Sequence, residues 1–194
     1  MFTNRIRRLP QVLEQIHLGD LVFIRVPTPL FMQVGNATGT WTNHVGVVID
    51  ESGTVAESRF PLSGATTFKR FVGRSSRGRV AVMRLRRPIA PTERARIVAS
   101  ARQRMGIVYD TGFNLHSRRQ FCSRYAREVM AEATGEELGT VESLADLLRA
   151  RPDVPLWFWQ LWYFGRIPWD RQTVTPASLL HSPALKTVFD GHAR

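Results

Sequence analysis

The hydrophobic period of this 194-residue chain changes near residue 90, and this change constrains the fold more than any other feature. Before Pro88 the apolar residues form short runs separated by turn-forming residues, a pattern typical of β-strands. These runs cover residues 21–24, 43–49, 54–58 and 80–85. After Pro91 the apolar residues recur at helical spacing, which predicts helices over residues 92–105, 119–134 and 143–150. Strands followed by helices predict an α+β fold in which an antiparallel sheet packs against helices.

Length and composition favour a single domain that spans residues 1–194. A chain of this length can bury a core without disulfides, and its 43% hydrophobic and 22% charged residues exclude a disordered or collagen-like protein. The apolar run at 156–164 is interrupted and too short for a transmembrane segment, and the basic N-terminus lacks the apolar run of a signal peptide. With a single cysteine, the sequence predicts a cytoplasmic protein whose thiol stays reduced.

An aromatic-rich C-terminal tail covers about residues 155–194. Seven aromatic side chains fall between Trp157 and Trp169. Such a cluster is typical of core packing, but it can also line an apolar groove for an acyl chain or rest on a membrane surface. The sequence leaves these interpretations open.

The net charge of +11 is concentrated in one segment. From Lys69 to Arg104 there are twelve basic residues and one acid, Glu93, so this segment alone carries +11 and the rest of the chain is neutral. Arginine forks onto phosphate and carboxylate groups, so the segment predicts weak contacts with nucleic acid, anionic lipid or an acidic partner. The alternative is a solvated basic face, because no nucleic-acid-binding motif accompanies the charge.

Cys122, the single cysteine, lies where the second helix is expected to begin. Unpaired N–H groups at a helix N-terminus stabilise an anion and lower the pKa of a thiol placed there. Arg118, Arg119 and Arg124 are expected to act in the same direction. Cys122 is therefore a candidate nucleophile, with its own N–H as an oxyanion donor. The alternative is a buried cysteine that acts as a small apolar residue.

His44 and Glu57 are the candidate partners of this thiol. His44 lies on the strand at 43–49, on the face opposite its apolar residues, where Gly46 leaves room for an approaching group. If the hairpin turns between Asp50 and Glu51, Glu57 opposes His44. If it turns one residue later, Glu57 opposes Gly46, on the same face as His44. In both registers the imidazole and carboxylate can meet, whereas an odd-numbered loop would place them on opposite faces.

Together the three residues predict a thiolate nucleophile, an imidazole base and a carboxylate that fixes the imidazole tautomer. The alternative for His44 is a structural histidine whose hydrogen bonds are satisfied in the core or at the surface. The alternative for Glu57 is an exposed glutamate on a strand. One cysteine, one histidine and one glutamate are few ligands for a metal site. The sequence also has no phosphate-binding glycine loop. We therefore expect neither a metal nor a cofactor.

Several motifs resemble those of the permuted papain-like enzymes. The resemblance is strongest to the bacterial YebB family, within the permuted NlpC-type superfamily that includes lecithin retinol acyltransferase. In that superfamily the order histidine, polar residue, cysteine implies catalytic roles for His44, Glu57 and Cys122. The motifs are Gly19-Asp20-Leu21-Val22-Phe23, Asn43-His44-Val45-Gly46-Val47, Val55-Ala56-Glu57-Ser58, Arg119-Gln120-Phe121-Cys122-Ser123, Ile167-Pro168-Trp169 and Thr173-Val174-Thr175-Pro176-Ala177-Ser178.

The sequence thus predicts a cysteine-dependent hydrolase or acyltransferase. It would act on an amide or ester bond of a small peptide-like or lipid substrate through a Cys122 acyl-enzyme. The alternative is a non-catalytic binding module, in which the segment from Lys69 to Arg104 holds nucleic acid or anionic lipid and the thiol is structural.

Overall fold

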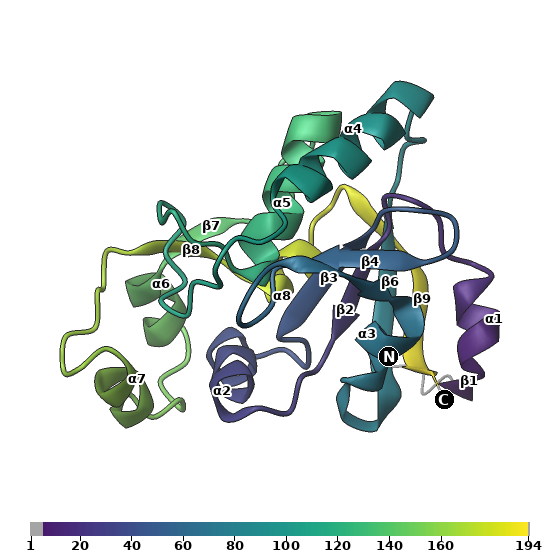
Figure 1. Cartoon of the computed structure of the whole chain (residues 1–194). Helices are drawn as coiled ribbons and strands as arrows, with labels where there is room; N and C mark the ends of the chain where they lie inside the picture. Colours follow the sequence, from purple (N-terminus) through teal and green to yellow (C-terminus); the bar gives the residue numbers. More distant parts are fainter. Residues whose placement is uncertain (1–5, 194) are drawn as a thin grey trace.

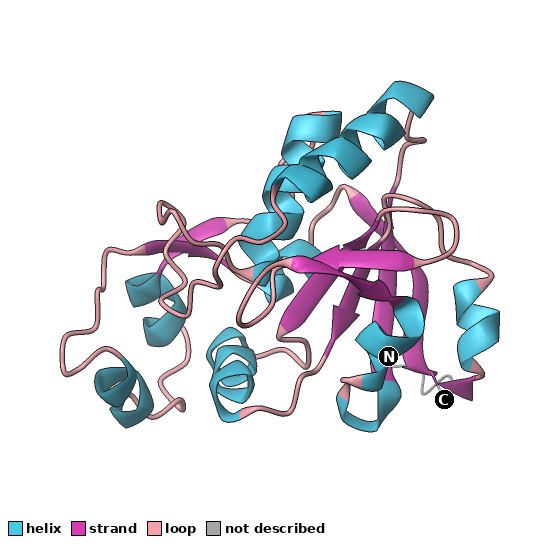
Figure 2. Ribbon diagram, viewed as in Figure 1, coloured by secondary structure: helices cyan, strands magenta, loops and turns pink. Residues whose placement is uncertain are grey.

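A seven-stranded sheet organises residues 6–193, the part of the chain that the computed structural model describes (Figures 1 and 2). The strand order is β1-β9-β6-β2-β3-β4-β5, and neighbours are antiparallel except for the parallel pair β1 and β9. A separate two-stranded sheet pairs β7 with β8. The strands are β1 (Ile6–Arg7), β2 (Leu21–Ile24), β3 (His44–Val48), β4 (Thr54–Glu57), β5 (Gly64–Thr67), β6 (Arg79–Leu85), β7 (Val141–Ser143), β8 (Gln172–Val174) and β9 (Leu185–Ala193).

Helices cover both faces of the large sheet and build two separate apolar cores. On one face α5 packs against β3 and β4, with α4 alongside it, and on the other face lie α1 and α3 (Figure 1). No helix in residues 6–193 has both the length and the apolar character needed to cross a membrane. The helices are α1 (Leu9–Leu13), α2 (Pro29–Thr38), α3 (Phe68–Gly73), α4 (Pro91–Gln103), α5 (Cys122–Thr134), α6 (Leu144–Arg149), α7 (Trp157–Trp162) and α8 (Pro176–Leu180).

The α+β arrangement expected from the sequence is confirmed, but the sheet is not confined to the first ninety residues. The C-terminal strand β9 runs beside β6 and lies between β6 and β1. Gly191 and the polar residues of β9 give it a weak strand pattern, so its extended conformation is stabilised by the long pairing with β6 more than by its own residue preferences. The helix α2 likewise begins at Pro29, in a stretch for which the sequence predicted no helix or strand.

Two helix starts differ from the predicted ones. The helix α4 begins at Pro91 with Ala90 as its N-cap, so Thr92 is not the cap; Glu93 accepts a hydrogen bond from the Ala90 N–H at 2.8 Å. The helix α5 begins at Cys122 rather than at residue 119, because Phe121 is still extended. Cys122 is therefore the first helical residue, where backbone N–H groups have no intrahelical partner.

The basic segment from Lys69 to Arg104 is partly neutralised by acids from distant parts of the chain. Six of its twelve basic side chains form ion pairs. Asp20, for example, is buried and accepts two hydrogen bonds from Arg84, at 2.7 and 2.8 Å. The pairs are Arg74–Glu57, Arg79–Asp190, Arg84–Asp20, Arg87 with Glu93 and Glu136, Arg94–Glu51, and Arg104 with Glu128 and Glu132. Much of this charge thus stabilises the fold, and anion binding by the segment stays a prediction.

Candidate active site

Cys122 lies at the N-terminus of α5, buried against the sheet. The helix packs on β3, so its first turn faces the strand that carries His44. The helix dipole and the unpaired N–H groups of the first turn favour a negative charge at this position. The fold thus places the single thiol where a thiolate is stabilised.

His44 begins β3, and its imidazole is almost fully buried. Its Nε2 lies 2.5 Å from Oε2 of Glu57. Phe71 stacks on the ring at a centroid distance of 5.7 Å, and Phe31 contacts it edge-on at 5.8 Å. The other ring nitrogen, Nδ1, is buried without a hydrogen-bond partner among the described residues, so it is the nitrogen available to the thiol of Cys122. The imidazole thus has the carboxylate of Glu57 at one nitrogen and the thiol of Cys122 as the neighbour of the other.

Glu57, the last residue of β4, is completely buried and bound through both carboxylate oxygens. Oε2 contacts His44, and Oε1 accepts a hydrogen bond from Nη2 of Arg74 at 2.7 Å. The guanidinium of Arg74 also lies 4.9 Å above the ring of Phe71. Sequence reasoning missed Arg74, which follows α3 and is one of many arginines in its segment. Arg74, Phe71, Glu57 and His44 form one packed unit.

The hairpin register explains how His44 and Glu57 meet. Val47 pairs with Ala56, so Glu57 is level with Gly46, the second of the two registers that we considered. His44 and Glu57 are thus diagonal neighbours on one face. The room above Gly46 is not left for an incoming group, because an added Cβ would lie 2.5 Å from Val55 and 2.9 Å from Phe71. The glycine lets Phe71 pack against the imidazole.

Two polar side chains close to His44 and Glu57 in sequence, Asn43 and Asp50, have structural tasks. The Asn43 side chain bridges the N–H and C=O groups of Val26, at 2.8 and 3.0 Å. Asp50 accepts hydrogen bonds from Ser52 and Thr54 and closes the β3–β4 turn. Both side chains are occupied away from the imidazole, which leaves Glu57 as its carboxylate.

The electrostatics of the site favour an ion pair between the thiolate and the imidazolium. Burial alone lowers the pKa of His44, but the negative charge of Cys122 and the hydrogen bond to Glu57 outweigh it and raise this pKa to about 9. Burial alone raises the pKa of Cys122, yet His44 and the Tyr109 hydroxyl bring it below the ordinary thiol value. Burial also raises the pKa of Glu57, but His44 and Arg74 reverse this and lower it. The directions of all three shifts favour the charged forms: a thiolate, an imidazolium and a carboxylate.

This charge state predicts how Cys122 reacts with iodoacetamide. We expect alkylation to follow a pKa below the ~8.5 of a free thiol, because the imidazolium stabilises the thiolate. In His44→Ala the pKa should rise, since burial then acts without the opposing charge. Rates measured between about pH 5 and pH 10 test this expectation. His116→Ala is the control, because His116 is exposed and binds Gln172. Identical profiles for wild type and His44→Ala would contradict the ion pair.

Tyr109 is a site residue that sequence reasoning missed. It is buried, and its hydroxyl lies 3.9 Å from the sulfur of Cys122. Burial and the neighbouring thiolate raise the pKa of Tyr109 well above its ordinary value, so the hydroxyl keeps its proton and remains a donor. Tyr109 lies in a loop without periodicity, and its bridge to Gln120 and its backbone hydrogen bond to Pro61 hold it beside the nucleophile.

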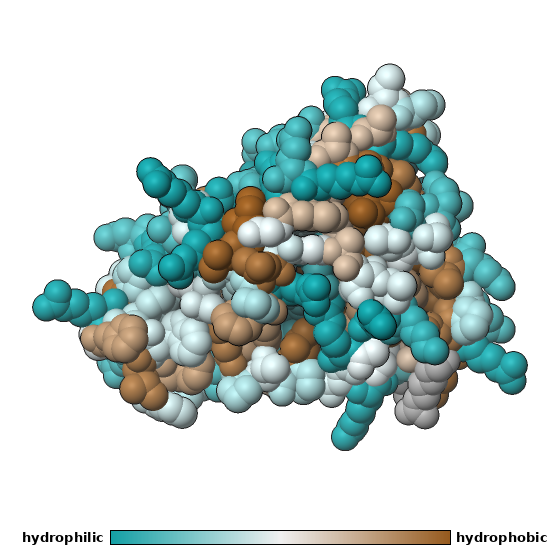
Figure 3. All heavy atoms as spheres, viewed as in Figure 1, coloured by the Kyte–Doolittle hydropathy of each residue, from teal (hydrophilic) through white to brown (hydrophobic). Residues whose placement is uncertain are grey.

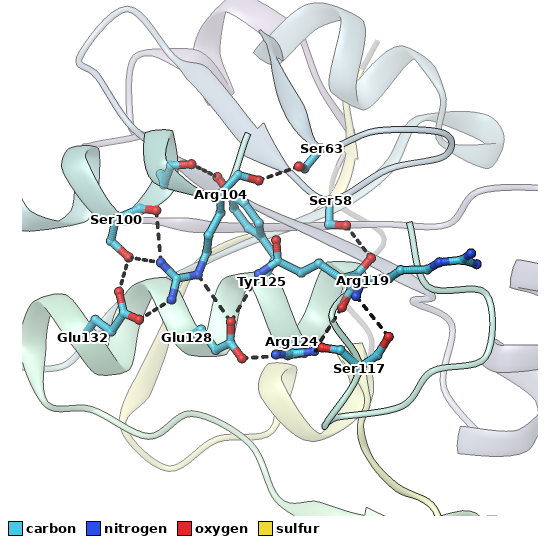
Figure 4. A network of polar contacts seen from close by, with 12 residues as sticks. Ser58, Ser63, Ser100, Arg104, Ser117, Arg119, Arg124, Tyr125, Glu128 and Glu132 are labelled. Atoms are coloured by element: carbon cyan, nitrogen blue, oxygen red, sulfur yellow. Dashed lines mark hydrogen bonds and ion pairs between the residues drawn. The ribbon is translucent and has the colours of Figure 1, made fainter. Parts of the chain in front are cut away.

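A polar network fixes the segment that leads into α5 (Figure 4). Glu128 accepts hydrogen bonds from Arg104, Arg124 and Gln120. Arg124 also donates to the backbone oxygens of Ser117 and Arg119, at 2.6 and 3.0 Å. Arg124 therefore holds the loop before Cys122 and is neutralised by Glu128. The direct hydrogen bonds of Arg124 thus go to Glu128 and to the loop, and its expected effect on the thiolate stays a prediction.

Cys122 is one of the residues that line an apolar cavity. The space between its walls is about 480 Å³, including some open solvent, and only about 30 Å³ can be reached by the centre of a water molecule, so the cavity is narrow. No charged side chain lines it. The lining comes from α2, the loop before α5, α6, α7 and the segment after β8: Val34, Ala37, Thr38, Asn43, Tyr109, Phe113, Phe121, Cys122, Ser123, Leu144, Leu147, Leu148, Trp159, Thr173, Val174, Thr175 and Pro176.

Comparison with known proteins places this chain in a family. Residues 15–189 match the family described as permuted papain-like amidase enzyme, YaeF/YiiX, C92 family. The chain belongs to the permuted papain-like amidases. It is similar to the uncharacterized protein YiiX of Escherichia coli K12, with 24% identity over 182 residues that cover 93% of this chain and 89% of YiiX. The YebB group named from the sequence motifs is thus replaced by the YaeF/YiiX group of permuted papain-like amidases.

The fold of this permuted papain-like amidase also matches a solved structure. The crystal structure described as metalloprotein yiiX from Escherichia coli O157:H7 superposes with a TM-score of 0.82 at 22% identity. The match covers 92% of this chain and 99% of that chain. The permuted papain-like fold expected from the sequence is confirmed.

Proposed function

We propose that this permuted papain-like amidase is a thiol hydrolase that cleaves an amide or ester bond with a slender apolar acyl group. The observation that carries the proposal is the buried imidazole of His44, held by Glu57 on one nitrogen and left with the other for the thiol of Cys122. A nucleophile, a base and an orienting carboxylate in contact are the requirement for covalent acyl transfer.

The reaction follows from these positions. The Cys122 thiolate attacks the carbonyl carbon, and the oxyanion that forms is stabilised by the Cys122 N–H and the Tyr109 hydroxyl. The His44 imidazolium donates its proton to the departing amine or alcohol, leaving a thioester and a neutral imidazole. Neutral His44 then takes a proton from water as the water attacks the thioester. Release of the carboxylic acid restores the thiolate–imidazolium pair.

The apolar cavity supports a preference for the acyl side of the substrate. An uncharged, narrow space beside the nucleophile favours an unbranched hydrocarbon group over a charged or bulky one. Each methylene that such a cavity buries contributes about 0.8 kcal/mol. Chain length should therefore change the rate until the cavity is filled.

A series of p-nitrophenyl esters and p-nitroanilides with acyl groups of increasing length tests this function. We expect kcat/KM to rise up to about fourfold per added methylene and then to level off. Val34→Trp should remove the gain for longer chains while retaining turnover of the acetyl substrate, because Val34 lines the cavity. The matched control is Val188→Trp, at a half-buried valine of the other core. No turnover of any substrate by the wild type would contradict the proposal.

A similar crystal structure is described as that of a metalloprotein, so we tested whether the described residues of this chain could hold a metal ion. In residues 6–193 no group of three or more His, Cys, Asp or Glu side chains is arranged to hold a metal ion. Both oxygens of Glu57 are already taken by His44 and Arg74. The donor set does not fit a metal, and we derive no step through one.

A further inference from the structure

Apolar side chains on α7 and in the turn that follows it project into solvent. Trp157, Leu161 and Phe164, named here the α7 tip, have exposed fractions of 61%, 72% and 95%. Trp157 and Leu161 lie four residues apart on one side of α7, and Phe164 follows in the turn after the helix. The opposite side faces inward, since Trp159 is buried and stacks on Tyr163. Both sides of α7 are therefore apolar, and only one of them is covered.

The surroundings of the α7 tip contain arginine but little acid. Between Val154 and Trp169 the one charged residue is Arg166. Arg166 and Arg171 line an open hollow together with Leu161 and Phe164 of the α7 tip. Aromatic and aliphatic side chains beside arginines match a lipid surface, where the rings enter the headgroup region and the guanidinium groups contact phosphate.

The shape of the molecule favours a membrane over a protein groove as partner. Figure 1 shows α7 at the end of the molecule opposite β1 and both termini. Tan and brown atoms gather at the corresponding lower left of the space-filling view in Figure 3. Trp162 and Tyr163 anchor the segment by hydrogen bonds to the backbone oxygens of Thr111 and Gly112, at 3.0 and 3.1 Å. The α7 tip is thus an exposed apolar group, anchored from behind at one end of the molecule, and suited to shallow insertion.

We propose that the α7 tip docks this protein on an anionic lipid bilayer. Its inward residue Trp159 lines the apolar cavity that reaches Cys122, so docking brings one end of that cavity close to the lipid surface. The net charge of +11 adds a general attraction to anionic headgroups. Docking itself requires no catalytic step and does not rest on the proposed function.

Sedimentation of the full chain with vesicles tests the proposal. The vesicles contain phosphatidylcholine alone or phosphatidylcholine with about one third phosphatidylglycerol. We expect binding to the anionic vesicles and at least about tenfold weaker binding for Leu161→Ser/Phe164→Ser, because two inserting side chains are removed. Arg166→Gln should reduce the preference for anionic vesicles.

Two controls separate docking from other effects. Ile6→Ser/Leu13→Ser removes two exposed apolar side chains near β1 and should bind as the wild type does. Cys122→Ala should also bind normally, so loss of activity and loss of docking remain distinguishable. The proposal is overturned if the wild type does not bind anionic vesicles or if the Leu161→Ser/Phe164→Ser variant binds them equally well. It is also overturned if light scattering shows a dimer that only this variant dissociates, since the tip then binds a second copy.

Discussion

Replacing Cys122 with alanine is expected to lower kcat/KM by at least about 10⁴-fold, because no other group can form the thioester. The fold should persist, since the side chain is small and alanine occupies nearly the same space. Turnover of the best ester of the acyl series, together with a thermal melt of each variant, measures both effects.

His44→Ala should reduce the rate by a similar factor, and the double variant should be little worse than either single one. When two groups act together in one step, removing either of them already abolishes their joint contribution to the rate, so removing the second lowers the rate little further. Ser182→Ala serves as a control for a small buried side chain remote in sequence from the three residues. Activity within about tenfold of the wild type in Cys122→Ala would show that another nucleophile acts.

The second large effect is expected at Glu57. Glu57→Gln keeps the size of the side chain but removes the charge that stabilises the imidazolium, so kcat should fall about 10²- to 10⁴-fold. The unfolding free energy should also fall by about 1–3 kcal/mol, because Arg74 and His44 lose a buried carboxylate. Glu51→Gln is the matched control, since Glu51 lies in the turn of the same hairpin and is exposed.

The pH dependence of stability gives an independent test of Glu57. The folded pKa of Glu57 lies below its ordinary value of 4.5, so its stabilising contribution is complete above that pH. The contribution is lost as the pH falls through the folded pKa. Melts of wild type and Glu57→Gln should therefore converge on acidification below about pH 4.5. A constant difference down to pH 3, or full activity of Glu57→Gln, would assign the orienting role to another group.

The sequence by itself determined the local elements and the faces of the strands. Short apolar runs located β2, β3, β4 and β6, and alternation placed His44 and Glu57 on one face in either even register. These features depend on residues close in sequence, because buried side chains recur about every second residue in a strand and about every 3.6 residues in a helix. The same patterns placed Cys122 near a helix start.

Only the tertiary structure decided what lies beside these residues. The hairpin register, the packing of Phe71 and Arg74 behind His44, and the approach of Tyr109 to Cys122 depend on contacts between segments far apart in the chain. The basic segment is a further example. Its arginines pair with distant acids such as Asp20 and Asp190, and the composition of the segment does not indicate which acids these are. Sequence periodicity reports whether a side chain is buried, whereas its partner depends on how the elements pack.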